Sequence, residues 1–132
     1  MPSNPFQTHG AFSWCELMTS DLAAAKKYYA ELFGWQLQQA PMPGMEYQII
    51  SAGGEQIGGM MGKPPMAPPD APPFWGCYVT VSDIDATVAK CRELGGTVCM
   101  GPHEIPGVGR MAVLQDPQGA VISAIQYTMP NK

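Results

Sequence analysis

The chain contains an internal repeat, and this repeat constrains the fold more than any other feature of the sequence. The residues from Trp14 to Leu22 return in outline as Gly76 to Ile84. The register then continues without a gap, through the pairs Ala24 with Ala86, Glu31 with Glu93, Leu32 with Leu94 and Gly34 with Gly96. The repeat predicts two similar modules that share one core, with the binding site between them.

Length and charge narrow the possible classes of protein. The 132 residues fit one domain, but either half alone is too short to bury a sufficient core, so the halves must pack together or onto a partner. The formal net charge is −4, and the lysines and arginines are scattered. This balance argues against nucleic acid as a partner, since phosphate binding requires a concentrated basic surface.

No apolar stretch approaches the length of a membrane span, and residues 1–6 lack the basic and apolar segments of a signal peptide. We therefore expect a cytoplasmic protein with no membrane partner. The four cysteines contain no Cys-x-x-Cys pair and lie within apolar patterns, at Cys15, Cys77, Cys91 and Cys99. This arrangement favours buried free thiols over disulfides.

The order of predicted elements in the first half is βαβββ. A strand over 11–18 is expected to place Phe12, Trp14, Glu16 and Met18 on one face. Ser20 or Asp21 can then cap a helix from Leu22 to Leu32 or Phe33, and Gly34 follows where a left-handed C-cap is expected. Three strands follow in the prediction, over 35–39, 47–52 and 56–61.

The second half repeats this order after a linker. Residues 63–73 contain six prolines, which exclude a helix or a central strand, so module one covers about 10–62 and module two about 74–128 of a single domain over 1–132. Module two is predicted to contain a strand over 74–81, a helix over 84–94 and strands over 97–100, 110–115 and 120–127. The sequence Asp116-Pro117-Gln118-Gly119 is typical of the turn in the last hairpin.

These features together resemble the vicinal oxygen chelate superfamily, which includes glyoxalase I, extradiol dioxygenases and bleomycin resistance proteins. The resemblance covers about residues 11–127 and depends on the two βαβββ units, the paired helix-start residues Asp21 and Asp83, and the Asp-Pro-x-Gly turn. It implies an α+β fold in which the sheets curl into a cup, with both helices on the convex face and the ligand cavity on the concave face.

Members of this family that use a metal place ligands on the first and last strands of each module. Carried onto this chain, those positions hold Trp14, Gly58 or Gly59, Gly76 and Ser123. None of these residues is an ordinary ligand for a divalent metal. The two histidines, His9 and His103, are predicted to lie in loops. We therefore expect no metal and no other cofactor.

Glu16 is the candidate catalytic residue. It is predicted to share the cup face with Trp14, and an aromatic ring beside a carboxylate suits a cationic or aromatic ligand. A carboxyl group in apolar surroundings is also easier to protonate, which suits a general base. The structural alternative is a buried ion pair between Glu16 and Arg110 or Arg92.

Further hydroxyl groups and one cation are candidates for the ligand site. Tyr47, Tyr78, Ser123 and Tyr127 are expected to contribute hydroxyls, and Arg110 to hold an anionic group or else to pair with Glu104 at the rim. His103 and Glu104 are adjacent, but neighbouring strand residues point to opposite faces, which argues against a proton-transfer pair.

Three functions remain open from the sequence. The first is a metal-independent protein that binds a small organic molecule in the cup, as bleomycin resistance proteins do. The second is an isomerase, lyase or hydrolase of a small metabolite that uses Glu16 as acid or base. The third is a non-catalytic interaction module with a filled cup. In each case we expect a homodimer, since paired modules leave sheet edges to be covered.

Overall fold

The structure, a computed structural model, describes residues 4–41, 46–63, 72–105 and 107–128. The chain forms two compact units. The first unit comprises residues 14–76, and the second unit comprises residues 1–13 together with 77–132. Most of the predicted proline-rich linker, residues 64–71, lies outside the described residues. In the described part of the chain, neither α-helix is long and apolar enough to cross a membrane.

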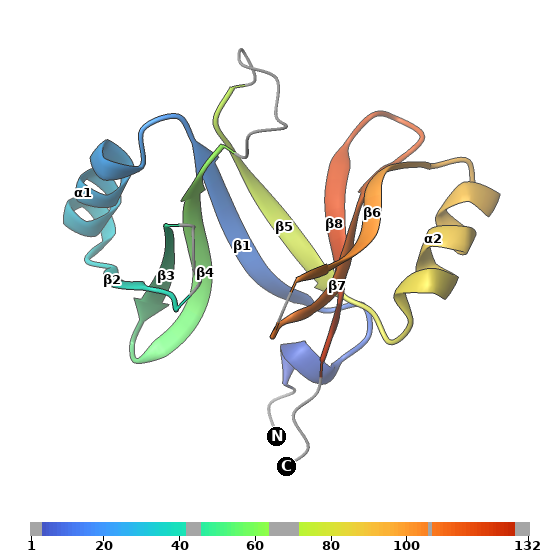
Figure 1. Cartoon of the computed structure of the whole chain (residues 1–132), viewed down its shortest axis with the longest axis horizontal. Coiled ribbons are helices and arrows are strands. Elements are labelled where there is room, and N and C mark those ends of the chain that lie inside the picture. The colour runs from blue at the N-terminus through green and yellow to red at the C-terminus, as the bar shows by residue number, and fades with distance from the viewer. Residues whose placement is uncertain (1–3, 42–45, 64–71, 106, 129–132) are drawn as a thin grey trace. The chain divides into compact units, whose positions relative to one another are not determined.

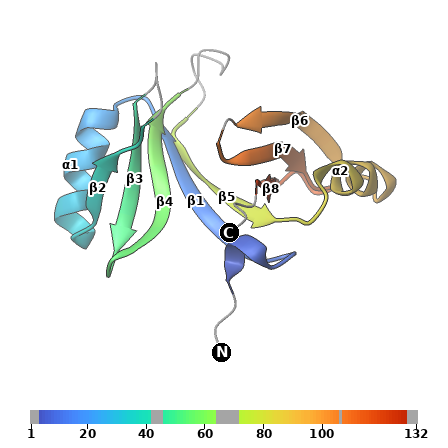
Figure 2. The ribbon, with the colours of Figure 1, turned by 60° about the horizontal axis from the view of Figure 1, so that its bottom comes forward.

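The first unit contains a βαβββ arrangement. Its elements are β1 (Phe12–Thr19), which begins in the second unit, α1 (Leu22–Phe33), β2 (Gln36–Gln39), β3 (Tyr47–Ala52) and β4 (Glu55–Gly62). The strands lie in the order β2-β3-β4-β1, with β1 parallel to β4 and the other pairs antiparallel. Figures 1 and 2 show α1 along one face of this sheet.

The second unit repeats the arrangement. It contains most of β5 (Phe74–Thr80), followed by α2 (Ile84–Glu93), β6 (Thr97–Ile105), β7 (Gly109–Gln115) and β8 (Val121–Tyr127). The strand order is β5-β8-β7-β6, with β5 parallel to β8. The predicted α+β class with two βαβββ modules is confirmed.

The helix ends follow the predicted capping chemistry. The Asp21 carboxylate accepts a hydrogen bond from the backbone N–H of Ala24 at 3.0 Å, and Asp83 does the same for Ala86 at 3.1 Å. Gly34 ends α1 in the left-handed conformation, at φ 73°. The Asp116 turn also forms, with a hydrogen bond from the Gly119 N–H to the Asp116 carbonyl.

Each helix covers an apolar core on its own sheet. In the first unit, Leu17, Ile50 and Met60 are buried beneath α1. In the second unit, Val81, Ala112 and Ala124 are buried with Ile84 and Val88 of α2. Successive residues of a strand point to opposite faces of its sheet. The residues between these core positions therefore lie on the face that points away from the helix.

The N-terminal segment packs on the second unit, although the sequence places it beside module one. The 3₁₀ helix η1 (Pro5–Gln7) leads into a segment that hydrogen-bonds to Thr80 of β5 through Gly10 and Ala11. The Thr80 hydroxyl also donates to the Pro5 carbonyl at 2.6 Å. Main-chain pairing with β5 therefore determines where this segment lies.

Two further predictions were wrong. Strand β6 extends to Ile105, so His103 and Glu104 lie in a strand and not in a loop. The register shift between Met100 and His103 lets the strand continue past Gly101-Pro102. None of the four cysteines is in a disulfide, as predicted, but Cys15 and Cys99 are exposed and Cys77 and Cys91 are only half-buried.

Candidate functional site

The face of β1 that points away from α1 carries the candidate residues. Leu17 is buried beneath the helix, whereas Trp14 and Met18 pack against Tyr47 and Met61 on the other side of the sheet. The predicted alternation along this strand is therefore confirmed. Since residues at even positions of β1 share one face, Glu16 lies between Trp14 and Met18 on it.

A chain of hydrogen bonds connects three side chains on this face. The Trp14 indole N–H donates to the Tyr47 hydroxyl at 2.8 Å, and the Tyr47 hydroxyl donates to Glu16 Oε2 at 2.6 Å. Both bonds run toward the carboxylate, so the two donors act on its negative charge in sequence. We refer to these three residues as the Trp14–Tyr47–Glu16 network.

The Tyr47 ring occupies space that is available because Gly59 has no side chain. In the sheet Gly59 is paired with Glu16 on one side and with Ile49 on the other. A Cβ atom added at Gly59 would overlap both the hydroxyl and the ring of Tyr47. Because position 59 has no side chain, Tyr47 extends from β3 across β4 and reaches Glu16 on β1.

Glu16 is a buried carboxylate, with an exposed fraction of 8%. Burying a carboxylate is costly unless hydrogen bonds stabilise it, and the Tyr47 hydroxyl supplies one. The alternative in which Arg110 neutralises Glu16 is not supported, since Arg110 pairs with Asp85. A buried carboxylate beside an aromatic ring can accept a proton, hold a cation or receive a hydrogen bond from a ligand.

The residues at the family's metal positions do not fit a metal. The indole nitrogen of Trp14 carries a proton and is a donor, and Gly58, Gly59 and Gly76 have no side chain. The space above Gly59 is taken by the Tyr47 ring. Within the described ranges, no group of three or more His, Cys, Asp or Glu side chains could hold a metal ion.

Tyr78 and Ser123 are brought together in the second unit. They are register partners on the parallel strands β5 and β8, and Tyr78 is buried. The next pair, Val79 and Ala124, includes a residue of the core beneath α2. Tyr78 and Ser123 therefore share the face of their sheet that points away from α2.

Arg110 lies on the other face, toward α2. Its guanidinium forms two hydrogen bonds with the Asp85 carboxylate, at 2.9 and 3.2 Å. These hydrogen bonds lower the pKa of Asp85 and raise that of Arg110. The expected ion pair with Glu104 is replaced by this one, although Glu104 is the register partner of Arg110 on β6.

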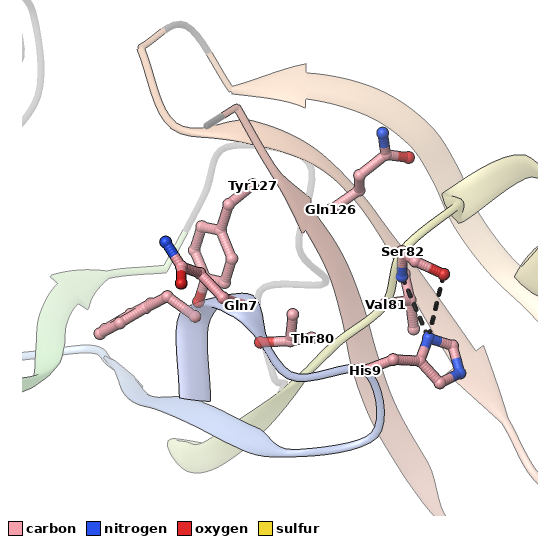
Figure 3. A pocket seen from close by; sticks show the side chains of 8 residues that line it. Gln7, His9, Thr80, Val81, Ser82, Gln126 and Tyr127 are labelled. Carbon is pink, nitrogen blue, oxygen red and sulfur yellow. Dashed lines mark hydrogen bonds between the residues drawn. The ribbon is translucent and has the colours of Figure 1, made fainter. Parts of the chain in front are cut away.

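A pocket of about 410 Å³ lies between the N-terminal segment and the ends of β5 and β8 (Figure 3). His9 accepts a hydrogen bond at Nδ1 from the Ser82 N–H at 3.0 Å, which leaves the ring proton on Nε2. Tyr127 lines the pocket, and burial raises the pKa of its hydroxyl while a hydrogen bond with Ser13 opposes that change. All of the pocket's lining residues belong to the second unit, and none is a member of the Trp14–Tyr47–Glu16 network.

Sequence reasoning missed how Tyr47 reaches Glu16. The two residues were separate candidates, and no pattern predicted that a tyrosine would extend across the intervening strand. The one available signal was the Gly58-Gly59 pair within a predicted strand, because glycine inside a strand often marks a close approach of other atoms.

The sequence matches a known family over residues 11–123, described as the glyoxalase/bleomycin resistance protein/dioxygenase superfamily. The "Putative glyoxylase CFP32" of Mycobacterium tuberculosis (strain CDC 1551 / Oshkosh) is 38% identical over 128 residues, which cover 96% of this chain and 49% of the relative. "Anthracycline biosynthesis protein DauV" of Streptomyces sp. (strain C5) is 32% identical over 126 residues, which cover 86% and 46%. The chain thus spans about half the length of these curated relatives.

Solved structures show the same fold. A methylmalonyl-CoA epimerase from Mycobacterium tuberculosis superposes with a TM-score of 0.69 at 15% identity, covering 93% of this chain and 92% of that one. The protein BH1468 from Bacillus halodurans C-125 gives a TM-score of 0.70 at 10% identity, covering 95% and 99%. At such low identity the likeness concerns the fold and not the reaction.

Proposed function

The chain belongs to the glyoxalase/bleomycin resistance protein/dioxygenase superfamily, and from this premise we propose that it binds a small organic molecule at the Trp14–Tyr47–Glu16 network without a divalent metal. The observation that carries the proposal is Glu16, a buried carboxylate that accepts a hydrogen bond from Tyr47. In this proposal the protein is cytoplasmic and sequesters the molecule. Sequestration requires a binding site but no catalytic group.

The chemistry of the network favours a ligand that is cationic, aromatic or both. Glu16 can pair with a protonated amine, and the Trp14 ring can contact an aromatic body or stabilise a cation through its π face. The net charge of −4 also attracts cations. Two relatives are named for the biosynthesis of anthracyclines, a class of aromatic compounds, which supports the same ligand class.

A matched pair of substitutions tests this proposal. The parent protein, Glu16→Gln and Glu55→Gln would be screened by thermal shift against a library of aromatic amines and neutral aromatic compounds. Glu55 is an exposed residue of the same unit, so its variant controls for the loss of one negative charge. We expect ligands that stabilise the parent and Glu55→Gln but not Glu16→Gln. Equal stabilisation of all three proteins would contradict the proposal.

A second candidate function is catalysis with Glu16 as the acid or base. The observation that favours it is the same buried carboxylate, whose hydrogen bond from Tyr47 fixes its orientation. An isomerase or lyase of a small metabolite would use Glu16 to take a proton from the substrate, and a hydrolase would use it to take a proton from the attacking water. NMR of each ligand found in the screen, incubated with the parent and with Glu16→Gln, would separate turnover from simple binding.

Metal independence has a test of its own. Elemental analysis of the purified, untagged protein should show well below one zinc, nickel, iron or manganese ion per chain. Chelators should leave its melting temperature unchanged, because the family's ligand positions hold Trp14, Gly58 or Gly59, Gly76 and Ser123. A stoichiometric metal would contradict the proposal.

A further inference from the structure

One pocket of the second unit has no part in the proposed function. It lies between the N-terminal segment and the ends of β5 and β8, and we call it the β5–β8 pocket (Figure 3). Its volume of about 410 Å³ is within the range of small-molecule sites, which is about 300–1,000 Å³. None of the eight described residues that line it is an aspartate, a glutamate, a lysine or an arginine. A ligand would therefore meet no carboxylate, ammonium or guanidinium group among them.

Two aromatic rings form one wall of the β5–β8 pocket. Phe6 of η1 and Tyr127 of β8 lie edge to face, with ring centroids 5.1 Å apart and an interplanar angle of 76°. The Tyr127 hydroxyl is hydrogen-bonded to the Ser13 hydroxyl at 2.7 Å, and the Thr80 hydroxyl holds η1 by donating to the Pro5 carbonyl. Because these contacts order the wall before binding, the protein loses little side-chain entropy when an aromatic ligand packs on it.

Three polar side chains of the β5–β8 pocket have hydrogen-bond partners within the second unit and carry no charge. His9 accepts at Nδ1 from the Ser82 N–H, so its imidazole is neutral, with the proton on Nε2. The Gln126 amide oxygen accepts from the Ile84 N–H at 2.8 Å. Burial raises the pKa of the Tyr127 hydroxyl, which therefore stays protonated at neutral pH. An apolar ligand that covers these atoms breaks no hydrogen bond.

A neighbouring pocket of the same unit has different chemistry. It has a volume of about 480 Å³ and shares His9, Val81 and Ser82 with the β5–β8 pocket, but it extends along α2. Its lining includes Asp83 and Lys90, which are charged side chains of opposite sign. This α2-side pocket therefore favours polar or charged molecules, whereas the lining of the β5–β8 pocket offers a charged group no opposite charge.

We propose that the β5–β8 pocket is a second ligand site and that it takes a small, uncharged aromatic molecule. The rings of Phe6 and Tyr127 supply the aromatic contacts. The uncharged lining selects against ammonium and carboxylate groups, because a charge loses hydration there without gaining a partner. The inference does not depend on the proposed function, since no residue of the Trp14–Tyr47–Glu16 network lines this pocket.

NMR titration of the full chain with three naphthalene probes of nearly equal size tests the proposal. The probes are 2-naphthylmethanol, which is uncharged, 2-naphthylmethylamine, which is a cation at neutral pH, and 2-naphthoate, which is an anion. Binding is followed on the backbone amide signals of Val81, Ser82 and Tyr127, so the dissociation constants refer to this pocket. We expect 2-naphthylmethanol to bind there about tenfold more tightly than either charged probe, because an unpaired charge is unfavourable in the pocket.

A matched pair of variants then changes the charge of the lining. Gln7→Glu adds one carboxylate at an exposed residue of the β5–β8 pocket, and Gln118→Glu adds one at an exposed turn residue outside it. Gln7→Glu should reduce the preference for 2-naphthylmethanol over 2-naphthylmethylamine about threefold or more, because the cation gains a partner. Gln118→Glu should keep the preference of the parent. Circular dichroism would establish that both variants are folded.

Three results would overturn the proposal. The first is the absence of a saturable change in the Val81, Ser82 and Tyr127 signals with any probe. The second is a charged probe that binds the parent there as tightly as 2-naphthylmethanol, or an equal change of preference in Gln7→Glu and Gln118→Glu. The third is a set of changes confined to Thr87 and Leu94, which line only the α2-side pocket of the two.

Discussion

The two units share one element order but distribute their chemistry differently. The second unit buries Ile84 and Val88 of α2 and adds the Arg110–Asp85 ion pair on its surface. The repeat equivalents of Ile84 and Val88 in the first unit are Leu22 and Lys26. Neither of these two side chains is fully buried. On the opposite face, the first unit carries Trp14 and Glu16 at the positions that Gly76 and Tyr78 occupy in the repeat.

This difference suggests a division of roles between the two copies of the module. The helix of the second unit contributes two buried residues to its core, whereas the first unit combines a buried carboxylate with exposed aromatic side chains. Residues that place charge or polarity in the interior, or expose aromatic rings, are usually explained by what they bind. Four predictions test this division of roles.

The largest effect is expected from the helix cores. Ile84→Ala should lower the free energy of unfolding by about 2–5 kcal/mol, because Ile84 is fully buried. The repeat-equivalent change, Leu22→Ala, should lower it by only about 1–2 kcal/mol, because Leu22 is half-buried. Urea unfolding of both variants beside the parent measures the difference. Equal losses of unfolding free energy in the two variants would show that the two helices contribute equally to the stability of their units.

Gly59→Ala should be the next most harmful change. The new methyl group overlaps the Tyr47 ring, so the variant should lose about 1–3 kcal/mol of stability and displace Tyr47 from Glu16. Gly62→Ala on the same strand is the control, because its Cβ meets only the Thr19 carbonyl at 3.9 Å. A Gly59→Ala variant as stable as this control would show that Tyr47 does not need the space.

Substitutions within the network should have smaller effects. Tyr47→Phe removes the donor to Glu16 and the acceptor for Trp14, and should cost about 1–2 kcal/mol. Glu16→Gln should cost no more than about 1 kcal/mol, since an amide oxygen can still accept the Tyr47 hydrogen bond. A loss of about 3–5 kcal/mol on Glu16→Gln would indicate a buried ion pair instead. Urea unfolding again provides the measurement.

The smallest effect concerns the Arg110–Asp85 pair on the second unit. Hydrogen bonds from Arg110 lower the pKa of Asp85 in the folded state, so the pair stabilises the fold above the ordinary carboxyl pKa and this contribution disappears as the pH falls. Arg110→Gln should therefore be slightly less stable than the parent at about pH 6 and equal to it at about pH 2. A difference that is independent of pH would assign the stabilisation to packing.

Most of the fold could be predicted because its signals are local. Asp21 and Asp83 cap helices, Gly34 ends one, and Asp116 begins a turn through interactions within a few residues of each. The extension of β6 through His103 could not be predicted, because Gly101-Pro102 usually ends a strand. Here the pairing of β6 with β7 resumes after a register shift.

The candidate site was only partly predictable, because its contacts are not local. Alternation along β1 correctly placed Trp14 and Glu16 on one face. The hydrogen bond from Tyr47 depends on a residue of a third strand, Gly59, and no pattern in the sequence links those positions. Arg110 was expected near a ligand, but its partner Asp85 is on a helix whose distance from β7 depends on the packing of the whole unit.

The most direct test of the Trp14–Tyr47–Glu16 network is NMR of the Trp14 indole N–H during titration with a ligand from the thermal-shift screen. Substitution of Trp14 assigns the signal. We expect a saturable change in this signal that Glu16→Gln weakens and Glu55→Gln does not. Saturable changes confined to residues around His9 and Tyr127, with Trp14 unaffected, would place the ligand in the pocket of the second unit and contradict binding at the network.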